Sequence, residues 1–510
     1  MRLSDFTRSN ILVTCCSLLG VAVNFASQVL IAYYFGAQAE RDAYFTAITV
    51  PTYLVTLFVG SVSVVFLPFF VNFRKNHSEE DVQRFVSSIS GILLLFLSLL
   101  TLAAYLFADQ VVHASAPGFT EEQISLTVKL FRILIFSVTF QCLASIFSVF
   151  HHINGKFILP AISPIALPVA GLIFVALFHN YGMVSLAAGT LVGSAISALL
   201  LLAPVWKQLR LRFLGFVSNS PALHILKISA PLFLTGILFR LTTIIERIFA
   251  SHLPAGSISY LGYANQLYLL MATIATGSIA TTYYPVLAAA WADNKKEEFE
   301  GHLQKGISLI LLITLPIAAV FLVLANPIIK ILFQRGAFDS NATAAVSFSL
   351  AILMGAFLFG SIGNLLMKVF YIAGKTTANS VISIAELVVY ILLAWWFAGK
   401  FSYPGLALAL TLSKGFSILV SAILLKRWNC ISAGMFSSEL LKLLVAALAC
   451  GAVSYLVYHQ LEKQPAFLAA SVSGLAGMLI YVLMVFRVLP IKGLQLNFGS
   501  SKLISLSNNN

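Results

Sequence analysis

Leu67-Pro68-Phe69-Phe70 ends an apolar stretch and leads into a charged run at residues 74–81. The same pattern recurs about 217 residues later, where Tyr284-Pro285-Val286-Leu287 leads into the charged run 293–298. Two more matches lie at nearly the same offset: Ala116-Pro117-Gly118-Phe119 with Arg335-Gly336-Ala337-Phe338, and Ile153-Asn154-Gly155-Lys156 with Ile372-Ala373-Gly374-Lys375. An internally duplicated transmembrane unit is typical of alternating-access carriers, in which one half moves against the other around a central site.

The composition is that of a polytopic membrane protein. Of the 510 residues, 59% are hydrophobic and 10% are charged, against roughly 25% charged in an average soluble domain. About fourteen apolar stretches are each long enough to cross a hydrocarbon core of ~30 Å. They cover roughly 11–35, 44–72, 84–107, 128–151, 157–178, 182–205, 229–250, 258–290, 305–324, 343–370, 377–398, 404–425, 438–459 and 466–486. Continuous runs of this length predict helices, so we expect an all-α fold.

The repeat predicts two six-helix lobes, at residues 1–215 and 216–430. Two further helices follow at 431–492, and a polar cytoplasmic tail occupies 493–510. An even number of spans in each repeat gives the two lobes the same orientation, related by an axis along the membrane normal.

The formal charge of +13 suggests nucleic acid as a partner, but the basic residues are not distributed for that role. Lysine and arginine are concentrated in alternate loops, which is the signature of membrane topology. The less basic side holds only Arg41, Lys129, Lys330, Arg335, Lys400 and Lys463. We therefore expect no nucleic-acid binding and a multi-pass protein of the bacterial cytoplasmic membrane with both termini in the cytoplasm.

Ionisable residues within the predicted seventh span indicate a candidate site. Arg240 and Arg247 are seven residues apart, so they share one helix face, and Glu246 is adjacent. Charged groups in the hydrocarbon normally face a bundle interior or a wet cavity. Cations on one face suit an anionic substrate, because the guanidinium fork matches phosphate or carboxylate. The alternative is that Glu246 and Arg247 pair with each other or with a neighbouring helix.

Other polar groups within the spans are further candidates. Glu386 and Lys414 have opposite charges on successive predicted helices and form either a structural ion pair or a coupling-ion site. Arg132 near the outer end of the fourth span is a weaker candidate for substrate contact. The uncharged candidates are Asn24 and Gln28 in the first span and Asn265 and Gln266 in the eighth. These side chains either form hydrogen bonds between helices or line a cavity.

The five cysteines have no metal-ligand spacing, and we expect neither a metal site nor a disulfide framework. We expect no cofactor either. No loop is large enough for a catalytic domain, and no nucleotide-binding motif is present. The chain is therefore predicted to be a transporter rather than an enzyme.

Several segments, in order, resemble the MurJ/MviN branch of the multidrug/oligosaccharidyl-lipid/polysaccharide exporter superfamily across nearly the whole chain. They are Phe35-Gly36-Ala37 with Asp42-Ala43-Tyr44-Phe45, Ala116-Pro117-Gly118-Phe119, Ile248-Phe249-Ala250-Ser251 with Gly256-Ser257-Ile258-Ser259, Tyr263-Ala264, and Leu332-Phe333-Gln334-Arg335-Gly336-Ala337-Phe338. The resemblance implies fourteen helices, in two lobes plus two C-terminal helices. It also implies transport of a polyprenyl-pyrophosphate-linked saccharide, which in peptidoglycan synthesis is lipid II.

The chain departs from this family where the family is most cationic. Ser27-Gln28 aligns with an Arg-Asp pair, Val55-Thr56 with paired arginines, and Asn265-Gln266 with Asp-Arg. Asp42 matches a family acid, and Glu246-Arg247 falls where many members have an acid followed by arginine. Arg240 is then the replacement charge that this chain supplies itself.

The sequence therefore predicts a flippase for lipid II or a related capsule, O-antigen or exopolysaccharide precursor. Its expected partners are this lipid-linked saccharide, membrane lipids and envelope-synthesis enzymes. A sodium or proton gradient, the membrane potential or mass action would drive it. The alternatives are a cation-coupled exporter of small amphipathic molecules, a membrane glycosyltransferase that uses Glu40 and Asp42, and a scaffold without transport activity.

Overall fold

The part of the chain that the structure describes is helical throughout. The structure is a computed structural model, and it describes residues 3–61, 78–206, 241–431 and 439–488. The helices are α1 (Leu3–Phe35), α2 (Ala39–Ser61), α4 (Glu79–Leu106), α5 (Ala108–Ser115), α6 (Glu121–Ile153), α7 (Ile158–Ile162), α8 (Ala166–Phe178), α9 (Met183–Leu202), α11 (Ser257–Ala292), α12 (Lys296–Phe333), α13 (Ser340–Ile372), α14 (Thr376–Phe401), α15 (Tyr403–Arg427), α16 (Glu439–Gln460) and α17 (Ala466–Leu483). Residues 241–251 are also helical.

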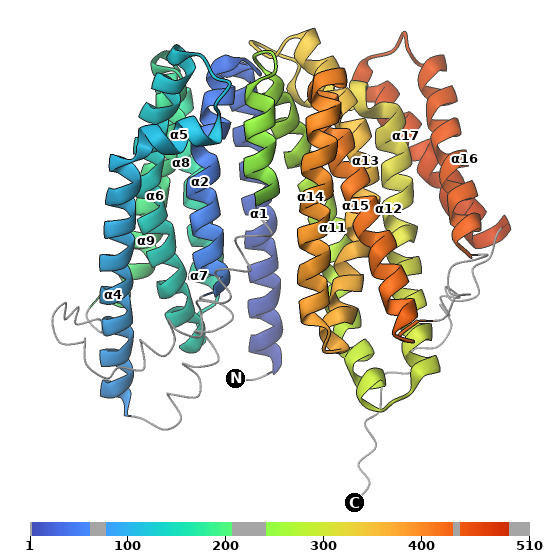
Figure 1. The fold of residues 1–510 in the computed structure, drawn as a ribbon, viewed down its shortest axis with the longest axis horizontal. Coiled ribbons are helices and arrows are strands. Elements are labelled where there is room, and N and C mark those ends of the chain that lie inside the picture. Colours follow the sequence, from blue (N-terminus) through green and yellow to red (C-terminus); the bar gives the residue numbers. More distant parts are fainter. Residues whose placement is uncertain (1–2, 62–77, 207–240, 432–438, 489–510) are drawn as a thin grey trace, which may run out of the picture. The chain divides into compact units, whose positions relative to one another are not determined.

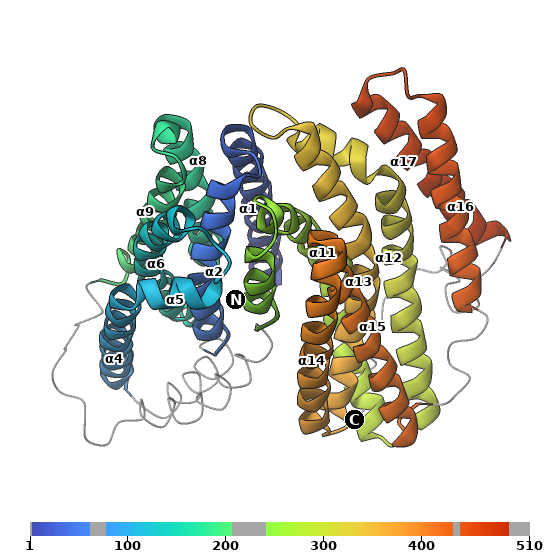
Figure 2. The same cartoon turned by 45° about the horizontal axis from the view of Figure 1, so that its top comes forward.

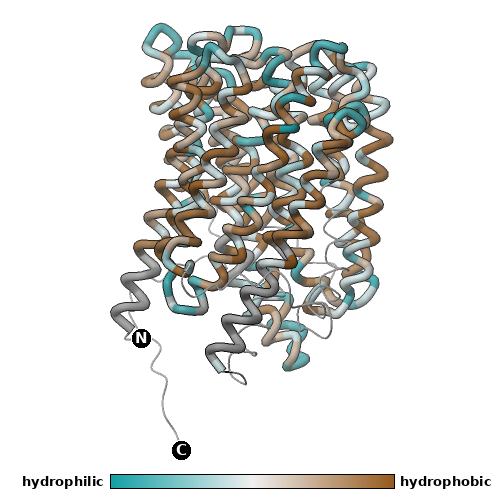
Figure 3. The backbone as a smooth tube through the Cα atoms, turned by 90° about the vertical axis from the view of Figure 1, so that its left-hand side faces the viewer, coloured by the Kyte–Doolittle hydropathy of each residue, from teal (hydrophilic) through white to brown (hydrophobic). Residues whose placement is uncertain are grey.

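These helices have the length and hydropathy of membrane spans. Within the described ranges, eleven pass as candidate spans, or twelve if the bent pair α4–α5 is counted as one. Hydrophobic residues occupy the middle of the helices and hydrophilic residues gather toward the ends (Figure 3). The all-α prediction is confirmed. The expected fourteen spans stay a prediction, because parts of the second and seventh lie outside the described residues.

The connection between the predicted spans 84–107 and 128–151 contains a short helix. α5 occupies its first part, and the axis of α5 turns by 71° from that of Leu94–Leu106. The sequence of α5, ADQVVHAS, is amphipathic and too short to span a bilayer. Such a helix belongs at the boundary between the hydrocarbon and water.

The repeated Gly-Lys motifs end their helices in the same way. Gly155 follows α6 with φ +70°, and Gly374 follows α13 with φ +67°. The next residue closes the cap in each case, because Lys156 N donates to His151 O at 2.9 Å and Lys375 N donates to Phe370 O at 2.8 Å. This is the Schellman geometry, which requires a left-handed residue just after the helix. The local agreement is what duplication of a helical unit produces.

The charged run after α11 forms an ionic turn. Lys295 Nζ lies 3.3 Å from a carboxylate oxygen of Asp293 and 3.6 Å from one of Glu298. Asp293 and then Glu298 raise the pKa of the Lys295 ammonium. The residues of this turn are solvated, as the charged motif at the end of an apolar stretch predicts.

The chain divides into two compact units. The first contains residues 1–266, 329–349 and 380–413. It therefore joins helices α1–α9 to one end of each of α11, α12, α13 and α15 and to nearly all of α14. In it α2 packs on α6, α6 on α9, and α9 on α8 (Figure 1). The second contains 267–328, 350–379 and 414–510, with α16 and α17 side by side (Figure 2). The candidate site lies in the first unit.

Candidate functional site

A buried carboxylate joins two segments that are more than 200 residues apart. Asp42, in the first turn of α2, is 2% exposed. Its Oδ2 accepts from Gly256 N at 2.6 Å, and its Oδ1 accepts from Ser259 N at 2.7 Å and from Ser259 Oγ. Both amides belong to the N-terminal end of α11, where backbone N–H groups lack partners within the helix and the helix dipole favours an anion. Asp42 therefore caps α11 from another helix. We call these three residues the Asp42 cluster.

Two tight turns meet beside the Asp42 cluster. Gly36, after α1, has φ +58°, and Gly336, after α12, has φ +61°. Ala337 N donates to Tyr33 O at 2.8 Å. A Cβ on Gly336 would overlap the Tyr33 carbonyl, and one on Gly36 would overlap the Ala337 carbonyl. Only glycine combines this backbone conformation with so close an approach.

Further hydrogen bonds connect the same group of segments. Gly118 N donates to Ser251 Oγ at 3.1 Å, and Tyr263 Oη donates to Gly36 O at 3.0 Å. The short motifs that carry the family resemblance thus converge on one end of the first unit. These segments are distant in the sequence but contact one another in the structure.

Arg41 is a buried cation, although the sequence groups it with the loop cations of the less basic side. It is 1% exposed in the first turn of α2. Its Nη2 donates to Gln28 Oε1 at 3.1 Å. Its guanidinium carbon lies 4.2 Å from the ring centroid of Phe45, 5.1 Å from that of Tyr44 and 5.4 Å from that of Tyr263. Gln28 therefore forms one of the interhelical hydrogen bonds that its position predicted. Arg41 lies in the first turn of a helix, where a cation is normally exposed at the membrane interface. It is buried here because Gln28 of α1 and Tyr263 of α11 contact it.

Glu246 and Arg247 form a pair with each other, which was the alternative to a direct substrate contact. Both are buried, and Arg247 Nη1 lies 3.5 Å from Glu246 Oε1. The same nitrogen donates to Ile258 O at 3.3 Å, and Asn265 Nδ2 lies 3.3 Å from both oxygens of Glu246. The guanidinium carbon of Arg247 lies 5.5 Å from the Phe45 centroid, so both buried arginines contact one aromatic ring.

The remaining predicted residues are spread over other surroundings. Asn24 is exposed on α1, and Gln266 is half-buried on α11. Arg240 lies outside the described residues. Glu386 and Lys414 are half-buried and belong to the first and second unit respectively, so their expected pairing stays a prediction.

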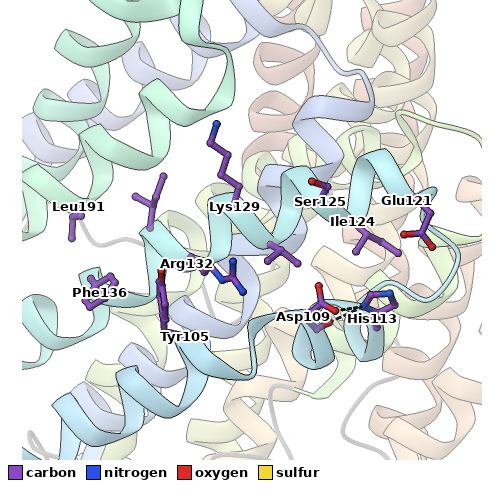
Figure 4. A pocket seen from close by; sticks show the side chains of 12 residues that line it. Tyr105, Asp109, His113, Glu121, Ile124, Ser125, Lys129, Arg132, Phe136 and Leu191 are labelled. Atoms are coloured by element: carbon purple, nitrogen blue, oxygen red, sulfur yellow. Dashed lines mark hydrogen bonds and ion pairs between the residues drawn. The ribbon is translucent and has the colours of Figure 1, made fainter.

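A separate groove of about 820 Å³ lies between α4, α5 and α6 (Figure 4). The guanidinium carbon of Arg132 lies 5.3 Å from the Tyr105 ring centroid at one part of it. His113 and Asp109 lie 3.8 Å apart at another, and Glu121 and Lys129 complete the charged lining. Arg132 lines this groove, and the interaction that the structure gives it is the cation–π contact with Tyr105.

A sequence profile described as "Lipid II flippase MurJ" matches residues 31–488. The chain belongs to this family. It is 29% identical over 418 residues to the "Probable lipid II flippase MurJ" of Buchnera aphidicola subsp. Acyrthosiphon pisum, with 80% of this chain and 81% of that protein covered. It is 26% identical over 433 residues to the "Lipid II flippase MurJ" of Burkholderia cenocepacia, with 82% of each covered.

Solved structures agree with this MurJ assignment. The structure of "Lipid II flippase MurJ, inward closed conformation" matches with a TM-score of 0.78 at 26% identity, covering 93% of this chain and 98% of that one. An inward-facing multidrug resistance MATE family transporter of the MOP superfamily matches with a TM-score of 0.66 at 15% identity, covering 82% and 98%. At that identity the MATE likeness concerns the fold alone. The resemblance to the MurJ/MviN family is confirmed.

Proposed function

We propose that this chain translocates lipid II, or a closely related polyprenyl-pyrophosphate-linked saccharide, across the bacterial cytoplasmic membrane by alternating access. The observation that carries the proposal is the MurJ profile match over residues 31–488. The buried arginines Arg41 and Arg247 support it, because a pyrophosphate crossing hydrocarbon requires compensating cations. The drug-exporter alternative has only a fold likeness in its favour.

The Asp42 cluster supplies a closed gate in this mechanism. Three donors on one carboxylate hold the start of α2 to the start of α11. Hydrogen bonds to a charged group contribute about 1.5–3 kcal/mol each. When this end opens, hydrogen bonds to water replace the three hydrogen bonds to Asp42. The free-energy difference between the closed and the open state therefore stays small enough for the transporter to cycle. The less basic loops adjoin this end, which supports an outward-facing gate and cytoplasmic termini.

The polar residues beside the gate are the proposed substrate contacts. Arg247 attracts the anionic head group while Glu246 holds its guanidinium, and Asn265 holds Glu246. Further proposed contacts are Asp42, Gln28, Asn24, Gln266 and Arg240. Glu386 and Lys414 are proposed to take part in coupling to sodium, protons or the membrane potential. Envelope-synthesis enzymes that make or consume the lipid are the proposed protein partners.

The test is flipping of fluorescent lipid II in proteoliposomes that contain the purified full chain. We expect Arg247→Ala to lower the rate at least about tenfold, the effect of losing one charge-assisted contact. Lys330→Gln, which removes an exposed cation, is the matched control and should keep the wild-type rate. A folded wild-type protein that gives no more flipping than empty liposomes would overturn the proposal. Dye efflux by the same preparation would then favour the exporter.

A further inference from the structure

Two nitrogens of the Arg41 guanidinium group have no partner with hydrogen-bond geometry. Its side chain is buried, and Nη2 donates to Gln28, yet Nε and Nη1 have no hydrogen-bond partner. Arginine does not lose its proton in proteins, so the charge and both donors persist. Buried polar groups nearly always have partners, and an exception in a native structure points to an absent ligand, ion or water.

The neighbouring carboxylates are engaged elsewhere. Asp42 accepts from the start of α11, and Glu246 pairs with Arg247 and contacts Asn265. Among the described residues, no ion pair joins Arg41 to a carboxylate. Its charge is therefore held by the faces of aromatic rings, and the Tyr263 hydroxyl is a further polar neighbour.

Arg247 extends the same arrangement. Its Nε is also buried without a partner, and its guanidinium contacts the Phe45 ring that Arg41 contacts. Two cations with three unpartnered guanidinium nitrogens around one ring suit an anion with several oxygens. Gln28 is half-buried, and Asn24, one turn earlier on α1, is exposed, so a polar helix face leads toward Arg41.

We propose that Arg41 and Arg247 together bind the phosphate oxygens of the lipid-linked substrate, with Gln28 as the residue that positions Arg41. This assignment rests on the proposed function and adds Arg41 to it as a direct substrate contact. The guanidinium donates from Nε and Nη1 to the anion while Nη2 stays on Gln28. The planar fork of arginine matches phosphate geometry better than a lysine ammonium does.

The decisive experiment changes the charge of Arg41 or of its partner Gln28 while keeping side chains of similar size at both positions. Flipping of fluorescent lipid II is measured against its mole fraction, with inorganic pyrophosphate as competitor, for the wild type, Arg41→Gln and Gln28→Glu. We expect Arg41→Gln to raise the half-saturating mole fraction about tenfold or more. Gln28→Glu gives Arg41 a carboxylate partner, so it should weaken pyrophosphate inhibition similarly while the thermal unfolding midpoint stays at or above the wild-type value.

A purely structural role for Arg41 predicts the opposite pattern. Gln28→Glu would then leave half-saturation and pyrophosphate inhibition unchanged, which overturns the assignment. The double variant Arg41→Gln with Gln28→Arg returns a guanidinium to the same contact from α1, and partial recovery of affinity is expected. Lys330→Gln serves as the control for loss of one positive charge.

Failure of this assignment is distinct from failure of the proposed function. A wild type that flips lipid II while Arg41→Gln keeps its half-saturation sinks the assignment alone. A wild type that flips no lipid II removes the proposed function, and pyrophosphate binding by calorimetry then decides the subsite. Equal binding to the wild type and Arg41→Gln would refute it, whereas weaker binding to Arg41→Gln would support an oxygen-rich anion site for another substrate.

Discussion

Arg41 and Asp42 are neighbours in the first turn of α2, but they have different partners. Asp42 accepts three hydrogen bonds from the start of α11, and Arg41 contacts aromatic rings and Gln28. The carboxylate is fully used and the guanidinium is not. The proposed closed gate and the proposed anion site therefore lie one residue apart.

At this scale, we predict that Asp42→Asn weakens the closed state. The amide keeps the shape but loses the charge that the α11 N-terminus favours, and its NH₂ group cannot accept from a backbone N–H. The expected loss is about 1–3 kcal/mol. It is measured as a lower thermal unfolding midpoint in detergent together with slower flipping of lipid II. Ser259→Ala removes only the hydroxyl donor and should have a smaller effect, so equal damage by both variants would contradict this account.

The sequence identified part of this site for physical reasons. Glu246 and Arg247 are ionisable residues within an apolar stretch, and such residues have few places to go except a bundle interior. Arg41 was missed because a cation at a helix start is normally interfacial. Its burial depends on rings from α2 and α11 that are far apart in sequence. The backbone N–H groups of Gly256 and Ser259 donate to Asp42, and the sequence does not reveal which backbone groups a carboxylate will contact.

At the scale of the elements, the turn between α12 and α13 determines how these two helices contact the end of α1. Gly336 needs both a positive φ and the absence of a Cβ, because the Tyr33 carbonyl and ring lie against it. Gly374 has a similar φ, but a Cβ there would meet nothing within 4 Å. Comparing substitutions at Gly336 and Gly374 therefore distinguishes the cost of the left-handed backbone from the cost of a steric clash.

We predict that Gly336→Ala is clearly more damaging than Gly374→Ala. The left-handed conformation disfavours any L-residue by about 1–2 kcal/mol at both positions. Only at Gly336 must the turn also move away from α1, which should lower the unfolding midpoint further and slow flipping. Thermal unfolding and flipping of both variants measure the difference. Similar values for the two would show that contact with Tyr33 does not hold the turn.

Helix positions follow from the sequence more closely than side-chain partners do. The predicted spans at 258–290, 343–370 and 404–425 correspond to α11, α13 and α15, with ends that differ by a few residues. Hydropathy alone determines these segments, because every backbone group in the bilayer must be bonded within its helix. Hydropathy did not predict α5 because this helix is short and amphipathic, and no proline marks the 71° bend before it.

For the molecule as a whole, the distribution of loop cations predicts its orientation. The turn after α11, with Asn294, lies on the basic side and should face the cytoplasm, whereas the turn between α16 and α17, with Lys463, should face outward. Both side chains are exposed, so cysteines there are accessible to reagent from whichever side they occupy. In a variant without the five native cysteines, Lys463→Cys should react with a membrane-impermeant maleimide in intact cells, and Asn294→Cys only after permeabilisation. The reverse pattern would invert the topology and put the Asp42 cluster at the cytoplasmic face, where it would control substrate entry instead of release.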